Sequence, residues 1–387
     1  MQSIKKAFVC CCFLGLASCS GGGGGGEGGP STTTGGSVST AIEVNPPTAE
    51  SSSSFKLLYQ AANGVIFPGY QAASGSFAAM QSALSTLCTT PDGSNLAAAR
   101  NAWRAAMDAW MQIALIQFGP IGRDNGELRI QFFPDNNNNV VRSTDRLLAG
   151  ADPVTSASIV NESVAAQGLP TIEYILFSSN APTEISSEPR RCDILNAAAG
   201  NIRSVMDSTV YEWDPAGAGY VNELAGAGLG SQRFPSEQFA IEELVNEMAG
   251  AASLVRIQKL TSPLGSSSAN AQPSQFESPR SQTSGKNIAQ NMIGLRRFYT
   301  GGDGFGFDDV LVERGRTDLN NRILQKISSV ESRANSLAGS LEAASQNGSR
   351  GQAEQLASEA ADLTRLFLDD LASELGVAIS FNENDGD

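Results

Sequence analysis

Apolar side chains recur at helical spacing along most of the chain from Phe55 onward, and this period constrains the fold more than any other feature. Between residues 96 and 117 the period is carried by large side chains, namely Leu96, Trp103, Met107, Trp110 and Ala114. Residues 319–341 and 356–375 carry two further long stripes, and the Gly-containing turn at 348–351 between them predicts an antiparallel hairpin. No strand-like alternation competes with these helices, so the sequence predicts an all-α fold.

The start of the chain has the composition of a bacterial export signal. Lys5 and Lys6 precede an apolar run over residues 7–16. That run is shorter than the ~20 residues a bilayer-spanning helix needs. The four residues that end at Cys19, Leu-Ala-Ser-Cys, resemble the lipobox of bacterial lipoproteins. This resemblance implies that residues 1–18 are a signal peptide and that Cys19 is lipidated, so its acyl chains attach the protein to a membrane.

The residue that follows the lipidated cysteine indicates in which membrane a bacterial lipoprotein is anchored. Here it is Ser20, and a residue other than Asp at this position favours the outer membrane. We therefore expect a lipid-anchored protein of the bacterial cell envelope that faces the periplasm. An exported chain also suggests a use for Cys88 and Cys192, the pair left after the four cysteines near the start. They are expected to form a disulfide in an oxidising compartment, the alternative being two unpaired buried thiols.

Composition divides the remaining chain into a tether and a folded body. Residues 19–54 contain six consecutive glycines followed by Pro, Thr and Ser, so they are expected to form a disordered tether. The folded body is long enough for two domains. A Gly- and Ala-rich stretch at residues 217–230 reads as their junction, which predicts a first helical bundle domain over 55–215 and a second over 216–387.

Charge and histidine content exclude several functions. The formal net charge is −14, which argues against a nucleic-acid surface and favours cations as small partners. The 387 residues contain no His. Catalysis by a Ser-His or Cys-His pair is therefore excluded, and the commonest metal ligand is missing.

One carboxylate, Glu173, stands inside the otherwise apolar stretch of residues 168–177. Burying a lone carboxylate costs several kcal/mol unless a cation, a metal or a hydrogen-bond donor meets it. Three interpretations remain open. Glu173 could point to water, it could lie in the positive first turn of a helix that begins near Pro170, or it could bind a ligand.

Several motifs together resemble the imelysin-like family of exported bacterial lipoproteins. They are NAWR at 101–104 with Trp110 and FGP at 118–120, GLPTIEYILF at 168–177, FESPRS at 276–281, and FNENDGD at 381–387. The resemblance covers nearly all of the mature chain. It implies two helical bundle domains side by side, with a ligand site where they meet. Members of the family have been described as peptidases, and others are tied to bacterial iron uptake.

The family's hallmark motif, Gly-x-His-x-x-Glu, is incomplete in this sequence. Gly168 and Glu173 match it, but Pro170 occupies the histidine position. His and Glu one helical turn apart can share a metal, whereas Pro and Glu cannot. The chain therefore resembles a branch without the motif histidine, and a zinc-peptidase mechanism is not expected.

These observations together predict a non-enzymatic periplasmic binding protein linked to the uptake of iron or another hard cation. Glu173 is the expected ligand residue, and Arg280 from the polar segment 265–285 is its expected charge partner, unless the two form a purely structural ion pair. Glu277 and Ser281 are expected to add oxygen donors. Expected partners are a metal ion or chelate, an uptake-system protein and the membrane, but no nucleic acid. The alternatives are a peptidase with another metal arrangement, and a structural or adaptor lipoprotein.

Overall fold

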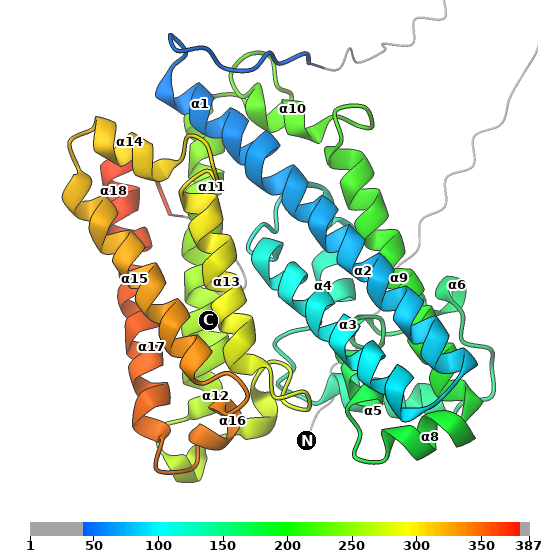
Figure 1. Ribbon diagram of the computed structural model, residues 1–387. Helices are drawn as coiled ribbons and strands as arrows, with labels where there is room; N and C mark the ends of the chain where they lie inside the picture. The colour runs from blue at the N-terminus through cyan, green and yellow to red at the C-terminus, as the bar shows by residue number, and fades with distance from the viewer. Residues whose placement is uncertain (1–41, 380–387) are drawn as a thin grey trace, which may run out of the picture. The chain divides into compact units, whose positions relative to one another are not determined.

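The computed structural model describes residues 42–379, and these residues are helical with no strand (Figure 1). The prediction of an all-α fold is confirmed. The signal peptide expected over residues 1–18, the lipidated Cys19 and the tether up to residue 41 lie outside the described residues. None of the described helices combines the length and the apolar character that a membrane span requires.

The first group of helices is built around one long rod. It runs through α1 (Ser53–Gln60), the π-helical turn η1 (Ala61–Ile66) and α2 (Phe67–Thr89). Along this rod pack α3 (Gly93–Ile113) and α9 (Pro189–Trp213) (Figure 1). Shorter helices lie between α3 and α9 in the sequence: α4 (Gly126–Ile130), α5 (Asn139–Ala149), α6 (Ser156–Ile159), α7 (Leu169–Leu176) and α8 (Ala181–Ser187).

The second group contains four long helical segments. They are α11 (Glu237–Leu254), continued by the π-helical turn η4 (Val255–Thr261) and α12 (Ser262–Leu264), α13 (Ser284–Tyr299), α15 (Thr317–Ser336), and α17 (Arg350–Arg365), continued by η7 (Leu366–Leu371) and α18 (Ala372–Leu375). The hairpin expected from the two C-terminal stripes is the pair α15 and α17 (Figure 1). Short helices α10 (Tyr220–Ala225), α14 (Phe307–Glu313) and α16 (Leu341–Ala344) complete the chain.

The two groups meet where α13 crosses α3. A Cβ atom added to Gly294 of α13 would lie 2.0 Å from the carbonyl oxygen of Gln112 on α3, so only glycine allows this approach. The side chain of Gln112 also donates to Gln290 at 2.7 Å. The domain boundary expected at residue 215 falls in the turn between α9 and α10, and the division into two domains stays a prediction.

One expectation of the sequence analysis, the extent of the tether, differs from the structure. Residues 42–52, assigned to the tether, pack on the folded unit, since Val44 contacts the hydrophobic core and Ser52 caps α1 through the Phe55 amide.

The disulfide expected between Cys88 and Cys192 is confirmed. Cys88 in the last turn of α2 is bonded to Cys192 in the first turn of α9, with their Cα atoms 5.5 Å apart.

Candidate functional site

A glycine places the motif helix α7 against the end of α4. A Cβ atom on Gly168 would come within 2.4 Å of the carbonyl oxygen of Ile130, so the close contact requires glycine at the N-cap of α7. Pro170 is tolerated because its missing N–H falls in the first turn. Glu173 is the fifth residue of α7 and is only 3% exposed. The interpretations that it points to water or lies in the first turn are therefore both wrong.

The carboxylate of Glu173 is hydrogen-bonded by Ser281, which was expected to offer an oxygen to a cation. The Ser281 backbone N–H and its hydroxyl donate to Oε1 of Glu173 at 2.8 Å and 2.7 Å. Burial raises the pKa of Glu173 to about 7, against the opposing effect of the Ser281 hydrogen bonds and of the positive charge of Arg280. The contact ties the first group of helices to the 276–283 segment of the second.

Arg280 does not make the expected contact with the carboxylate. Its guanidinium carbon lies 4.6 Å from the ring centroid of Tyr174, in a cation–π arrangement. Within the described part of the chain, no ion pair joins Arg280 to Glu173, and the arginine acts on it through its charge at longer range and through its backbone N–H. The expected ion pair between the guanidinium of Arg280 and the carboxylate of Glu173 is therefore not formed.

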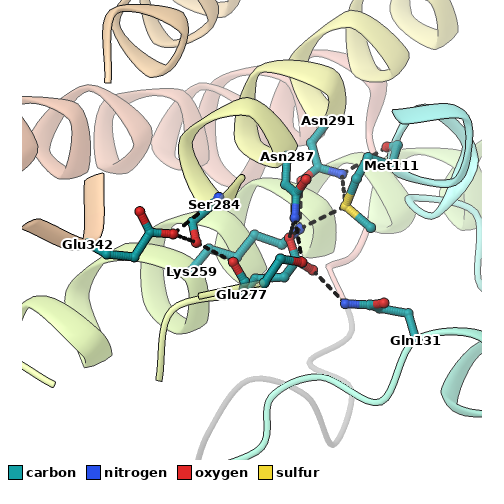
Figure 2. A network of polar contacts seen from close by, with 9 residues as sticks. Met111, Gln131, Lys259, Glu277, Ser284, Asn287, Asn291 and Glu342 are labelled. Atoms are coloured by element: carbon teal, nitrogen blue, oxygen red, sulfur yellow. Dashed lines mark hydrogen bonds and ion pairs between the residues drawn. The ribbon is translucent and has the colours of Figure 1, made fainter. Parts of the chain in front are cut away.

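Glu277 is paired with a residue that the sequence analysis did not single out, Lys259. Both are 3% exposed, and Nζ of Lys259 lies 2.8 Å from Oε2 of Glu277 (Figure 2). Lys259 also donates to Asn291 at 2.7 Å, and Asn287 donates to the same Glu277 oxygen at 3.0 Å. The carboxylate of Glu277, which was expected to bind a hard cation, is therefore paired with Lys259 instead. In residues 42–379 there is no cluster of three His, Cys, Asp or Glu side chains suited to a metal ion.

A signal for the buried lysine was present in the sequence. Lys259 follows Val255 by four residues, which continues the apolar stripe of α11 rather than its acidic face. In the structure it lies in the π-helical turn η4, a feature that often accompanies functional sites. A lysine on an apolar stripe beside the acid-containing segment 265–285 predicts a buried ion pair.

A cavity of about 260 Å³ lies beside this ion pair, between α3 and α4 of the first group and α11 of the second. Its apolar walls include Trp110 and Leu254. Its polar and charged lining residues are Gln117, Glu127, Gln131, Asn246, Glu247, Gln258, Lys259, Glu277 and Asn291. The motif residues Glu173 and Ser281 are not part of this lining, so they support the 276–283 segment rather than face the cavity.

Two carboxylates that line the cavity, Glu127 and Glu247, form no ion pair with another residue of the range 42–379. Glu247 accepts the Gln117 N–H at 2.7 Å, yet burial raises its pKa to about 8, and Glu243 adds to the rise. Burial also raises the pKa of Glu127. The face of α11 that carries Glu247 therefore borders the cavity.

Gln131 connects the two sides of the cavity. It is 9% exposed, and its Nε2 donates to Oε1 of Glu277 at 3.5 Å (Figure 2). Its own Oε1 is buried and has no partner among the described residues, and the same holds for Oε2 of Glu127. The cavity therefore combines apolar walls with two lining side chains that each have an unpartnered acceptor oxygen, an arrangement suited to binding a ligand that donates hydrogen bonds.

Comparisons with known proteins agree with this architecture. A curated relative, the iron-regulated protein A of Synechococcus elongatus, is 26% identical over 239 residues, which cover 61% of this chain and 62% of the relative. The chain thus matches less than two thirds of that relative's length. The crystal structure of an imelysin-like protein from Psychrobacter arcticum superimposes with a TM-score of 0.72 at 16% identity, over 88% of this chain and all of that one.

A second crystal structure shows the same fold. It is an iron-regulated protein A precursor from Parabacteroides distasonis, with a TM-score of 0.69 at 17% identity, covering 86% of this chain and 96% of that one. At these identities the two structures establish the fold alone. The family model of imelysin, peptidase M75, matches residues 66–367, which is well over half of the chain. The chain therefore belongs to the imelysin family.

Proposed function

We propose that this protein is a non-enzymatic binding protein of the bacterial cell envelope with a role in the uptake of iron. The observation that carries the binding role is the cavity between α4 and α11, whose polar side chains come from both groups of helices. The link to iron is supported by the relatives named iron-regulated protein A. The ligand is a chelate of iron, because residues 42–379 offer no cluster of three His, Cys, Asp or Glu side chains suited to the bare ion, and the protein delivers this chelate to a component of an uptake system.

The envelope location is part of the same proposal. The lipobox-like sequence that ends at Cys19 supports lipid anchoring, and Ser20 favours the outer membrane. The Cys88–Cys192 disulfide supports an exported protein, because such bonds persist in oxidising compartments. A simple check is metabolic labelling with a fatty acid. The label is expected on the full chain and is expected to be lost in Cys19→Ser, whereas unchanged labelling would contradict the proposal.

The non-enzymatic reading is supported by the incomplete family motif. Pro170 replaces the motif histidine, and no other histidine exists in these 387 residues to supply the missing group. The remaining motif carboxylate, Glu173, accepts two hydrogen bonds from Ser281. We expect no hydrolysis of a peptide library by the purified protein. Hydrolysis that chelators abolish would favour the peptidase alternative instead.

Tryptophan fluorescence offers a direct test of binding, because Trp110 lines the cavity while Trp103 and Trp213 are buried in the core. We expect ferric citrate and ferric acetohydroxamate, added separately to the purified full chain, to give saturable quenching with at least one of them. Trp110→Phe should remove most of the quenching, and Trp213→Phe is the matched control that should retain it. No saturable quenching, together with no heat of binding by calorimetry, would refute the iron-linked binding role.

A further inference from the structure

We propose that the cavity between α4 and α11 binds its ligand through an alkylammonium group, held by the carboxylates of Glu127 and Glu247 and by the side-chain oxygen of Gln131. This inference rests on the proposed function in one respect, namely that this cavity is the ligand site. It adds the chemical class of the group that enters the cavity, and it does not depend on the link to iron.

Glu127 lies in α4, and Gln131 is the C-cap residue of that helix. The backbone N–H of Gln131 donates to the carbonyl oxygen of Glu127 at 2.8 Å, so the two residues are one helical turn apart. Both residues line the cavity. Glu247 lines it from α11, on the other group of helices. Three side chains with acceptor oxygens therefore border one cavity.

Two of these side chains each leave one acceptor oxygen without a donor. Oε1 of Gln131 and Oε2 of Glu127 are buried without a hydrogen-bond partner among the described residues. Lys259 is a cation that lines the cavity, but its ammonium group already donates to Glu277 at 2.8 Å and to Asn291 at 2.7 Å. Buried polar atoms in proteins are nearly always paired, so acceptors left without donors indicate a donor supplied by the ligand.

The number of acceptors required distinguishes an ammonium group from a metal ion. A hard cation takes six or more oxygen ligands at short distance, whereas residues 42–379 offer no cluster of three acidic side chains suited to a metal. An ammonium group has three N–H donors, one for each of the three acceptor side chains. The apolar walls, which include Trp110, Leu115 and Leu254, match the methylene groups that such a ligand carries behind its charge.

Two sources can provide this chemistry. One is a small free amine, which the volume of about 260 Å³ can enclose. The other is a charged arm of a larger molecule, such as a ferric chelate with a pendant ammonium group, whose metal-binding part stays outside. Both place the same group between Glu127 and Glu247, and the experiment below separates them.

The first measurement is calorimetric titration of the full chain at pH 9, where Glu247 with its pKa of about 8 is ionised and the amine is still protonated, with three probes of equal length: pentylammonium, pentan-1-ol and pentanoate. We expect pentylammonium to bind at least tenfold more tightly than the other two. Glu127→Gln and Glu247→Gln should each weaken it by about ten- to a hundredfold, the loss typical of a hydrogen bond to a charged group. Glu242→Gln on the same helix is the matched control, because Glu242 does not line the cavity, and it should bind like the wild type.

Folding of the variants is checked by circular dichroism, and glutamine keeps an acceptor for the Gln117 N–H that Glu247 receives. The comparison of the three probes uses the wild-type protein alone, so it stands even if a variant fails to fold. Equal binding of pentylammonium and pentan-1-ol, or pentylammonium binding that both variants retain, would overturn the proposal for a free amine.

The second measurement uses a ferric trihydroxamate chelate with a pendant ammonium group and its N-acetylated form. If the protein binds the ammonium form at least tenfold more tightly than the acetylated form, and Glu127→Gln removes this preference, then the ammonium group that enters the cavity belongs to the arm of a chelate. This conclusion holds even if pentylammonium itself does not bind. Equal affinity for the two forms, together with no preference for pentylammonium, overturns the ammonium site. The iron-linked role then survives if ferric citrate or ferric acetohydroxamate still quenches Trp110, so the two failures are distinguishable.

Discussion

Removing Lys259 tests whether the buried ion pair holds the 276–283 segment in place. In Lys259→Met the aliphatic volume is kept, but the carboxylate of Glu277, only 3% exposed, loses its cation at 2.8 Å. Removing one partner of a buried pair costs about 3–5 kcal/mol. Asn287 at 3.0 Å and Gln131 at 3.5 Å still donate to Glu277, so we expect a value near the lower end, about 3 kcal/mol.

The assay is urea unfolding at pH 7, with the double variant Lys259→Met/Glu277→Gln as the decisive comparison. The double variant has no unpaired buried charge and its amide oxygen still accepts from Asn287, so it should recover at least 1 kcal/mol relative to Lys259→Met. Lys286→Met is the matched control. Its ion pair with Asp108 is equally short at 2.9 Å, but the lysine side chain is 44% exposed, so the loss should stay below about 1 kcal/mol.

The reasoning would be refuted by either of two results. One is a loss of less than about 1 kcal/mol in Lys259→Met, which would mean that Glu277 is accommodated without a cation. The other is strict additivity of the two substitutions, within the roughly 0.5 kcal/mol expected for independent sites, which would mean that the two side chains are not coupled.

Three further predictions concern stability and are checked by urea unfolding. The pKa of Glu173 is raised to about 7 in the folded state, so its contribution to the free energy of unfolding is present at pH 5 and is lost as the pH rises to 8, by about 3 kcal/mol. Glu173→Gln should remove this pH-dependent loss, and an unchanged pH profile would contradict the burial of the acid. Reduction of the Cys88–Cys192 disulfide, which spans 104 residues, should cost about 4–5 kcal/mol in the chain-entropy model, and a loss below 1 kcal/mol would argue against that model here. Gly294→Ala should lower the free energy of unfolding by about 1–3 kcal/mol, because the added Cβ would collide with a backbone oxygen of α3. Gly351→Ala, in open space on α17, should be neutral or stabilising. Equal effects of the two substitutions would show that the crossing of α3 and α13 can relax.

Much of the fold could be predicted from the sequence because apolar period and helix breakers are local signals. The stripes at residues 96–117, 319–341 and 356–375 correspond to α3, α15 and α17 with its continuation. Short elements are harder to predict from such signals. Thr155 and Ser158 form a capping box that starts the short α6, and a separate 3-10 turn follows at Val164–Ala166.

The site was only partly predictable, since its residues meet through tertiary contacts. Glu173 and Ser281 were singled out by their motifs, and the structure joins them. Glu247 could not be assigned, because an acidic residue on an amphipathic helix gives no sign of whether its face meets solvent or another group of helices. Lys259 carried a signal in its position on the apolar stripe, but its partner in the 265–285 segment could be identified only from the fold.

The most direct test of the central claim, that the cavity between α4 and α11 is the ligand site, is a crystal structure of the protein with pentylammonium bound. The account predicts the ligand nitrogen within about 2.7–3.2 Å of carboxylate oxygens of both Glu127 and Glu247, with the alkyl chain along the wall that contains Trp110. A ligand bound elsewhere on the protein, with this cavity containing only water at saturating pentylammonium, would contradict it.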